Sequence, residues 1–465
     1  MKLQEIAHKS AVELRRLIGE RELSPVQVVK ACLHQIGKWN SEVNAVVTLS
    51  PEVLGDARSA EQKVMSGEIL GPLHGLPVGI KDITPVADMR TTFGSSVYAD
   101  HVAEQDALVV RRLKQAGAIV LGKTNTSEFA AGANTFNDVF GPTRNPWNLE
   151  LTAGGSTGGG AAGLATGMFA LGEGTDLGGS LRIPAAFCGV VGLRPTVGLV
   201  PTHPSDYLWD SLSVTGPMAR RVEDVALMLQ VISGPSPETV LTQPVEGRDF
   251  LAAVEGKLDD GLAIAYCPDV SGIGIDPEVQ ECCRAAANGL DSAGVRVDEV
   301  EVDLSFSRKA FLSLRAHWML SHHLTRLEHL DSFGPDLAGN IRAGLELKAH
   351  ELASAERVRT TIWHQLRRFF LRYSLLLTPT TAVAPFPVEA THPEIVAGRR
   401  METYIDWAAP TFVLSVSGLP VASVPCGIDS RGLPVGIQIA GPPRSEELIL
   451  RMARTIQEAN PIGRP

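Results

Sequence analysis

The order of its predicted strands and helices most constrains how this chain can fold. A short apolar segment at 76–80 is followed by a helical pattern at 106–115 and a second apolar segment at 118–125. Two strands joined through a helix pair in parallel, because the connection must cross over one face of the sheet. The same order returns over 260–300. The sequence therefore predicts an α/β fold that contains parallel strand pairs.

Helical patterns occupy the beginning and end of the chain. Residues 1–65 read as helices, with Ser10 and Ser24 as N-caps, and 444–459 reads as a closing helix. Apolar segments typical of buried strands lie at 375–381, 421–427 and 435–441. No repeat or linker separates these parts. We expect one domain over residues 1–465, with 1–65 packing on it as an N-terminal helical segment.

Composition excludes several classes of protein. Of 465 residues, 44% are hydrophobic and 20% charged, which is ordinary globular composition. A formal charge of −10 argues against a binder of nucleic acid or of an anionic membrane, because such proteins carry a basic surplus. The six cysteines show no CxxC spacing, and no leader-like segment begins the chain. We expect a cytoplasmic protein without a cofactor or a metal.

Three polar features stand out in this apolar background. Lys81 directly follows the apolar run GLPVGI, and the loops 154–160 and 174–182 are rich in glycine and each contain one serine. Glycines beside a serine let the backbone approach a ligand and leave N–H groups free to point at it. Burial lowers the pKa of a lysine, so a lysine at the end of a buried strand can act as a base near neutral pH.

The loop 154–160 also fits a second motif. Gly154 to Gly158 match G-x-S-x-G, the nucleophile elbow, which would make Ser156 the nucleophile. That motif requires a buried strand before the serine, and NPWNLELTA is a poor strand candidate. A phosphate-binding P-loop is excluded because the Gly-Lys-Ser/Thr ending is missing.

Taken together, the three features resemble the amidase signature family of serine hydrolases. The lysine and the two serines are spaced by 75 and 24 residues, as in that family. The resemblance covers nearly the whole chain, in the segments 44–48, 71–82, 122–132, 140–147, 154–196, 215–226, 376–381, 418–427 and 432–441. It implies one large mixed β-sheet covered by helices on both faces. Many family members are dimers, so a homodimer is compatible with it.

The resemblance also implies a catalytic triad. Ser180 is then the nucleophile that forms an acyl-enzyme, Ser156 a bridging serine with a cis peptide bond, and Lys81 the base. A serine hydroxyl needs an adjacent base, and a lysine can take the place of a histidine. The negative oxygen of the tetrahedral intermediate would be held by backbone N–H groups of Leu177, Gly178, Gly179 and Ser180.

Further residues surround these positions. We expect supporting roles for Thr157, Thr175, Asp176 and Arg182, with Asp176 and Arg182 as a structural ion pair. Ala153, Thr157 and Gly160 depart from the residues usual in the family. We expect the substrate pocket to be lined by Ala130, Ala131, Gly132, Trp209, Asp210 and Trp318. The histidines His317, His322, His323 and His329 lack the spacing of a metal site.

The leading hypothesis is an amidohydrolase that acts on a small-molecule amide, with aryl or alkyl carbamates and esters as further substrates. A second hypothesis is the glutaminase component of a tRNA-dependent amidotransferase, which shares the triad. The glutamine-recognition segment of that subclass has no counterpart in this sequence. A third is a non-catalytic member that only binds amides.

Overall fold

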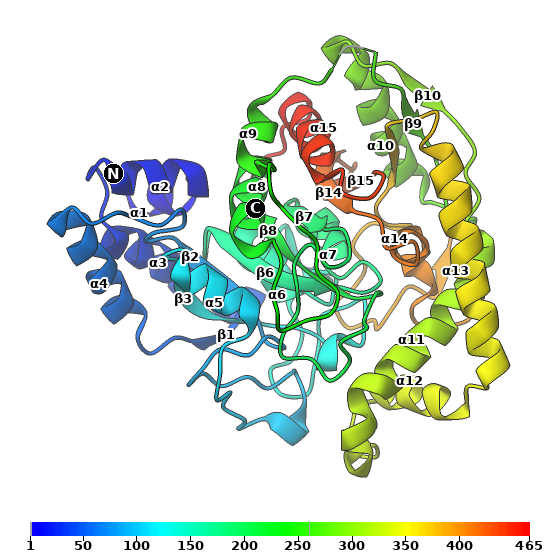
Figure 1. Cartoon of the computed structure of the whole chain (residues 1–465), viewed down its shortest axis with the longest axis horizontal. Helices are drawn as coiled ribbons and strands as arrows, with labels where there is room; N and C mark the ends of the chain where they lie inside the picture. Colours follow the sequence, from blue (N-terminus) through cyan, green and yellow to red (C-terminus); the bar gives the residue numbers. More distant parts are fainter. Residues whose placement is uncertain (1, 260) are drawn as a thin grey trace.

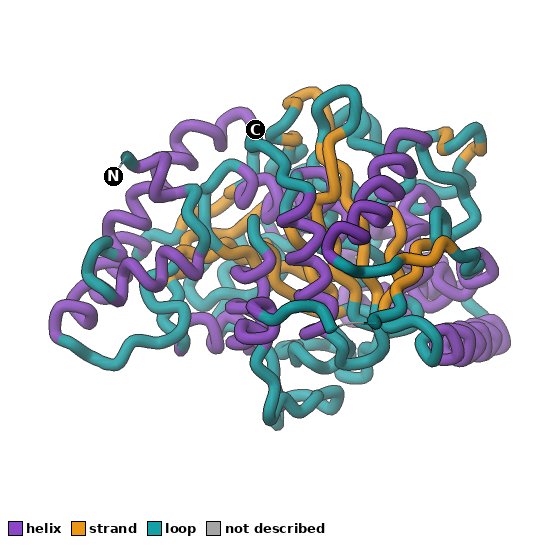
Figure 2. The backbone as a smooth tube through the Cα atoms, turned by 90° about the horizontal axis from the view of Figure 1, so that it is seen from above, coloured by secondary structure: helices purple, strands orange, loops and turns teal. Residues whose placement is uncertain are grey.

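The computed structural model of the chain describes residues 2–259 and 261–465. Within these residues, eleven strands form one mixed sheet through the middle of the molecule, with helices around it (Figure 2). In spatial order the strands are β1 (Val46–Leu49), β3 (Ile119–Thr124), β2 (Pro77–Lys81), β6 (Leu171–Asp176), β8 (Val214–Ala219), β7 (Val191–Arg194), β14 (Val421–Ile428), β15 (Pro434–Ala440), β11 (Leu375–Pro379), β9 (Ile264–Tyr266) and β10 (Val297–Glu299).

The two parallel regions predicted from the sequence are present. Strand β2 pairs in parallel with both β3 and β6, and β9 pairs in parallel with both β10 and β11. Between these two regions, each neighbouring pair of strands from β6 to β11 is antiparallel. The predicted α/β fold with one large mixed sheet is thus confirmed.

Helices cover both faces of this sheet. They are α1 (Leu3–Ala7), α2 (Ala11–Gly19), α3 (Pro25–Val43), α4 (Val53–Ser66), α5 (Leu108–Gln115), α6 (Gly158–Ala165), α7 (Arg182–Cys188), α8 (Val222–Ile232), α9 (Phe250–Glu255), α10 (Pro277–Gly289), α11 (Arg308–His323), α12 (Pro335–Glu346), α13 (Ala349–Phe369), α14 (Ala409–Ser415) and α15 (Glu446–Ala459). Strand β3 separates two hydrophobic clusters, because successive side chains point to opposite faces. Ile119 and Leu121 belong to the cluster that contains residues of α3, α4 and α6, whereas Val120 belongs to the larger cluster that contains residues of α5 and α8.

The N-terminal helices begin where their capping residues predict. Ser10 accepts a hydrogen bond from the backbone N–H of Glu13, and Ser24 accepts one from that of Val26. Helices α1–α4 gather at one end of the molecule and α11–α13 at the other (Figure 1). One strand in this region was not predicted: β1 pairs with β3 at the edge of the sheet.

The pairing of β2 with β6 determines where the polar loops lie. Gly79 is opposite Gly172 in a parallel register, so the carboxyl ends of both strands reach the same edge of the sheet. Lys81 ends β2 and Asp176 ends β6, which brings the loop before Ser180 close to the lysine. No helix in the described part of the chain is long and apolar enough to cross a membrane.

Candidate active site

The amine of Lys81 is surrounded by hydroxyl groups. The side chain is fully buried, and Nζ lies 2.7 Å from Ser156 Oγ, 2.9 Å from Thr157 Oγ1 and 3.0 Å from Thr175 Oγ1. Among the described residues, no carboxylate forms an ion pair with this amine. The predicted supporting positions Thr157 and Thr175 therefore contact the lysine directly.

This environment disfavours a positive charge on the lysine. Burial lowers the pKa of Lys81 from 10.5 to about 7, against the opposing influence of the negative charges on Glu173 and Asp176. An amine with such a pKa is largely unprotonated at slightly alkaline pH. It can then accept a proton from the hydroxyl that it contacts.

Ser156 lies in the bend between a strand and a helix. The preceding segment was a poor candidate for a buried strand; it forms strand β5 (Asn148–Thr152), which is mostly not buried and lies outside the large sheet. Strand β5 pairs with β4 (Arg144–Asn145) in a hairpin, and its Leu151 also forms a bridge to Pro387. The peptide bond between Gly155 and Ser156 is cis. The hydroxyl is fully buried and points at Lys81 instead of facing a cavity. A nucleophile elbow exposes its serine, so this geometry argues against that alternative.

Ser180 occupies a different environment. It is half-buried and lines a cavity of about 320 Å³. Its backbone oxygen accepts a hydrogen bond of 3.2 Å from the Thr157 N–H, which joins the two serine loops. Among the described residues, its hydroxyl forms no hydrogen bond. The structure thus brings Lys81 and Ser156 into contact and places the loop of Ser180, which lines the cavity, beside them.

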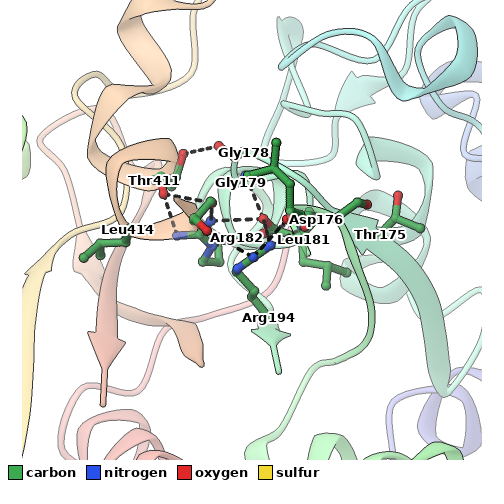
Figure 3. Close-up of polar contacts among 12 residues, drawn as sticks. Thr175, Asp176, Gly178, Gly179, Leu181, Arg182, Arg194, Thr411 and Leu414 are labelled. Atoms are coloured by element: carbon green, nitrogen blue, oxygen red, sulfur yellow. Dashed lines mark hydrogen bonds and ion pairs between the residues drawn. The ribbon is translucent and has the colours of Figure 1, made fainter. Parts of the chain in front are cut away.

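A buried carboxylate shapes the loop that carries Ser180. Asp176 accepts hydrogen bonds from the backbone N–H groups of Gly179 (2.8 Å) and Leu181 (3.3 Å) and from Arg182 Nε and Nη2 (3.0 Å each) (Figure 3). Arg194 Nη1 lies 3.4 Å from Asp176 Oδ1. Burial alone would raise the pKa of Asp176, but the arginines and the Gly179 N–H lower it to about 2. The predicted Asp176–Arg182 ion pair is present.

Arg182 connects this loop to the C-terminal part of the chain. Its Nη1 donates to Thr411 O (3.1 Å) and to Gln438 Oε1 (3.0 Å), and Nη2 donates to Ser415 Oγ (2.6 Å). The hydroxyl of Thr411 in turn donates to Gly178 O at 2.6 Å. Helix α14 and strand β15 therefore fix the loop from the side opposite Lys81.

The predicted oxyanion donors are only partly available. The Gly179 N–H already donates to Asp176, so it is not free to bind a substrate oxygen. Within the described residues, the N–H groups of Leu177, Gly178 and Ser180 donate to no protein group. The aspartate three residues before Gly179 could have indicated this contact from the sequence, because aspartate side chains commonly accept hydrogen bonds from backbone N–H groups a few residues further along the chain.

Gly179 itself offers a test of how tightly the loop is held. Its φ is +125°, and an added Cβ would lie 2.3 Å from Thr411 Oγ1. We expect Gly179→Ala to lower the free energy of unfolding by about 2–4 kcal/mol, measured by urea denaturation. Gly432→Ala is the control, since Gly432 has a φ of +79° but no atom near the added methyl group. Gly432→Ala should lower the free energy of unfolding by about 1 kcal/mol. Equal decreases in the two variants would contradict a close contact at Gly179.

The cavity wall contains four of the six predicted pocket residues. Ala130, Gly132, Asp210 and Trp318 line it, and the Trp318 indole N–H donates to Asp210 Oδ2 at 2.6 Å. The other two, Ala131 and Trp209, do not line this cavity. Ala131 is buried in a neighbouring hydrophobic cluster, and Trp209 is 66% exposed.

Sequence reasoning missed much of the aromatic wall. The rings of Phe93 and Phe129 stack with centroids 5.1 Å apart, and both line the cavity together with Tyr207. His323 also lines it, and burial lowers its pKa to about 3, so it is neutral. Phe93, Phe129 and Ala130 all have a positive φ, and nothing in the residue pattern indicates this backbone conformation. In the described residues, no group of three or more candidate ligands is placed to hold a metal ion.

Comparison with known proteins decides the family. A model of the family described as Amidase matches residues 27–450. The chain belongs to the amidase family. This amidase-family hydrolase is 34% identical to an acylamidase of Rhodococcus erythropolis, over 97% of the chain and 95% of that protein. It is 35% identical to a glutamyl-tRNA(Gln) amidotransferase component of Carboxydothermus hydrogenoformans, over 98% of both chains.

Solved structures agree with this assignment. A bacterial aryl acylamidase of the amidase signature enzymes superposes on the amidase-family chain with a TM-score of 0.90 at 29% identity, covering 97% of the chain and 96% of that protein. The corresponding glutamyl-tRNA(Gln) amidotransferase component of Thermotoga maritima gives a TM-score of 0.74, also at 29% identity, and the two chains are covered to 99% and 95%.

Proposed function

We propose that this chain is an amidohydrolase that cleaves the C–N bond of a carboxylic amide through an acyl-enzyme on Ser180. The observation that carries the proposal is the buried Lys81 amine, which lies 2.7 Å from the Ser156 hydroxyl beside a cavity lined by Ser180. In this proposal Lys81 is the base and Ser156 transfers the proton between it and Ser180.

The arrangement can perform acylation without any other group. The neutral Lys81 amine takes the Ser156 proton while Ser156 takes that of Ser180, and Ser180 Oγ bonds to the amide carbon. The N–H groups of Leu177, Gly178 and Ser180 supply donors for the resulting oxyanion, each worth about 2.7–4 kcal/mol in comparable sites. The proton then returns through Ser156 to the leaving nitrogen, and the C–N bond breaks. Water hydrolyses the ester that remains.

The cavity supports a substrate with an apolar, aryl-sized group. Its volume of about 320 Å³ and the rings of Phe93, Phe129, Tyr207 and Trp318 suit a flat apolar group next to the scissile bond. Aryl or alkyl carbamates and esters are further substrates of the same chemistry. The higher TM-score to the aryl acylamidase than to the Thermotoga maritima amidotransferase component, at equal identity, supports this substrate class.

A glutaminase is the second candidate, because the 35% identity to the Carboxydothermus hydrogenoformans amidotransferase component slightly exceeds that to the acylamidase. The two candidates differ in substrate. Release of ammonia from glutamine, with no hydrolysis of anilides, would favour the glutaminase. Turnover of anilides in the absence of any partner would favour the amidohydrolase.

The first test is intact-mass analysis after treatment with phenylmethylsulfonyl fluoride. We expect one sulfonyl adduct on the wild type and none on Ser180→Ala, because Ser180 lines the cavity beside the Lys81–Ser156 pair, whereas the Ser156 hydroxyl is fully buried. An adduct that survives in Ser180→Ala and is lost in Ser156→Ala would instead identify Ser156 as the nucleophile. Turnover of p-nitroacetanilide by the wild type and by both variants completes the test.

A further inference from the structure

A second buried acidic residue lies beside Lys81 and has no part in the chemistry described so far. Glu173, on β6, is fully buried. Its Oε2 accepts the backbone N–H of Lys81 at 3.1 Å, and its Oε1 accepts the Thr84 hydroxyl at 3.0 Å. Glu173 and Thr175 point to the same face of β6, and Thr175 contacts Lys81 Nζ. The carboxyl group is thus fixed next to the lysine without touching its amine.

We propose that Glu173 is a positioning residue whose buried negative charge favours the protonated form of Lys81 during acylation. The inference rests on the proposed function and extends it, since it concerns how the base holds its proton. Glu173 does not line the cavity, so it acts through Lys81 and not on the substrate.

The other acidic groups near Lys81 already have cationic partners. Asp82 follows Lys81 on the chain, accepts a hydrogen bond from the Thr92 N–H at 3.2 Å, and lies 3.8 Å from Lys123 Nζ on β3. Asp176 on β6 is paired with Arg182 of α7 and Arg194 of β7.

Glu173 differs from both of them. Among the described residues it forms no ion pair, and its two hydrogen bonds come from neutral donors. A charge that no arginine or lysine contacts is the least screened in this interior, where the effective dielectric constant is low. Its field therefore reaches the amine of Lys81 more strongly than those of Asp82 and Asp176.

The direction of the pKa shift at Lys81 agrees with this geometry, and the hydrogen bonds to Glu173 act to keep its carboxyl ionised. Burial lowers the pKa of Lys81, and Glu173 is the first of the two groups that oppose the shift. Burial raises the pKa of Glu173. The hydrogen bonds from the Thr84 hydroxyl and the Lys81 N–H, and the positive charges of Lys81 and Lys123, act in the opposite direction. When Lys81 takes the serine proton, the new positive charge is offset by Glu173.

The test replaces the charge and keeps the shape. Glu173→Gln removes the negative charge but retains an acceptor oxygen. Two rates would be measured across about pH 5 to 9: modification of Ser180 by phenylmethylsulfonyl fluoride, followed by intact mass, and kcat/KM for p-nitroacetanilide. We expect the acidic limb of both profiles to move to lower pH by about one unit, because Lys81 loses its proton more easily. The plateau should fall, because Lys81 becomes a weaker base.

Two control variants separate charge from structure. Glu173→Asp keeps the charge and should keep the limb near the wild-type position. Asp82→Asn removes an equally buried carboxylate that Lys123 already compensates, so it should cost stability without moving the limb. If Glu173→Gln does not fold, Thr84→Val is the second variant. It removes a hydrogen bond that lowers the pKa of Glu173, so the carboxyl is protonated more easily and its negative charge is reduced. The acidic limb should then move in the same direction by less.

Each outcome is decisive. The inference is overturned if the acidic limb of the pH profiles stays in place in Glu173→Gln, or in Thr84→Val when the first variant does not fold. Glu173 would then be a structural residue. A movement of the limb to higher pH overturns it as well. A wild type that is not modified at Ser180 and does not turn over the anilide contradicts the proposed function itself, which is a different result.

Discussion

Lys81→Met is expected to lower kcat/KM for an anilide by about 10³-fold while the protein stays folded. Methionine resembles lysine in length but cannot accept a proton, so Ser156 would have no base within reach. The hydroxyls of Thr157 and Thr175 would lose their contact to the amine and cannot replace it. Activity within tenfold of the wild type would show that Lys81 is not the base.

The chain offers a matched control for this variant. Lys123 is also fully buried, and it lies on β3, the strand next to β2, but its amine contacts the Thr91 hydroxyl instead of a serine. Lys123→Met leaves Asp82 without its ion pair and should cost stability, with an effect on kcat/KM far below that of Lys81→Met. In the wild type, activity should rise with pH through about 7, because Lys81 must be unprotonated to accept the serine proton.

Asp176→Asn is expected to lower the free energy of unfolding by about 3–5 kcal/mol, measured by urea denaturation. The substitution leaves Arg182 and Arg194 buried without a counter-charge. The control is Asp331→Asn, which removes the carboxylate of a surface pair with Arg342 in which Asp331 is 95% exposed. Surface pairs contribute little, so this variant should stay close to the wild type.

The effect of Asp176 depends on pH in a defined direction. Its folded-state pKa is about 2 and its ordinary value 3.8, so the carboxylate adds stability above the ordinary value. That contribution is lost as the pH falls from 3.8 toward 2. The difference between wild type and Asp176→Asn should therefore be constant near neutral pH and shrink in this acid range. A difference that does not shrink, or a variant as stable as Asp331→Asn, would contradict the ion-pair account.

Local chemical signals predicted a large part of this molecule. The strand–helix–strand order indicated the parallel pairs, because that connection has few geometric solutions. Ser10 and Ser24 marked two helix starts, since free N–H groups there need an acceptor. The spacing of Lys81, Ser156 and Ser180 indicated the family. The cytoplasmic location, the homodimer and the single-domain organisation stay predictions.

What the sequence could not show depends on contacts made by the folded chain. Trp209 looked like a pocket residue, but whether an aromatic ring turns inward depends on how its loop packs against α11. Strand β5 has polar residues and lies outside the large sheet, so its apolar pattern is weak. The loss of Gly179 as an oxyanion donor follows from the direction of the Asp176 side chain.

The contacts of Arg182 also bear on when the site can form. Its acceptors Thr411 and Gln438 lie 229 and 256 residues further along the chain. Bringing such distant segments together carries a loop-closure entropy that local contacts do not, and contacts of this range form late in folding. During synthesis, the loop of Ser180 leaves the ribosome long before β15 does. The proposed nucleophile therefore reaches its final geometry only after nearly the whole chain has been made.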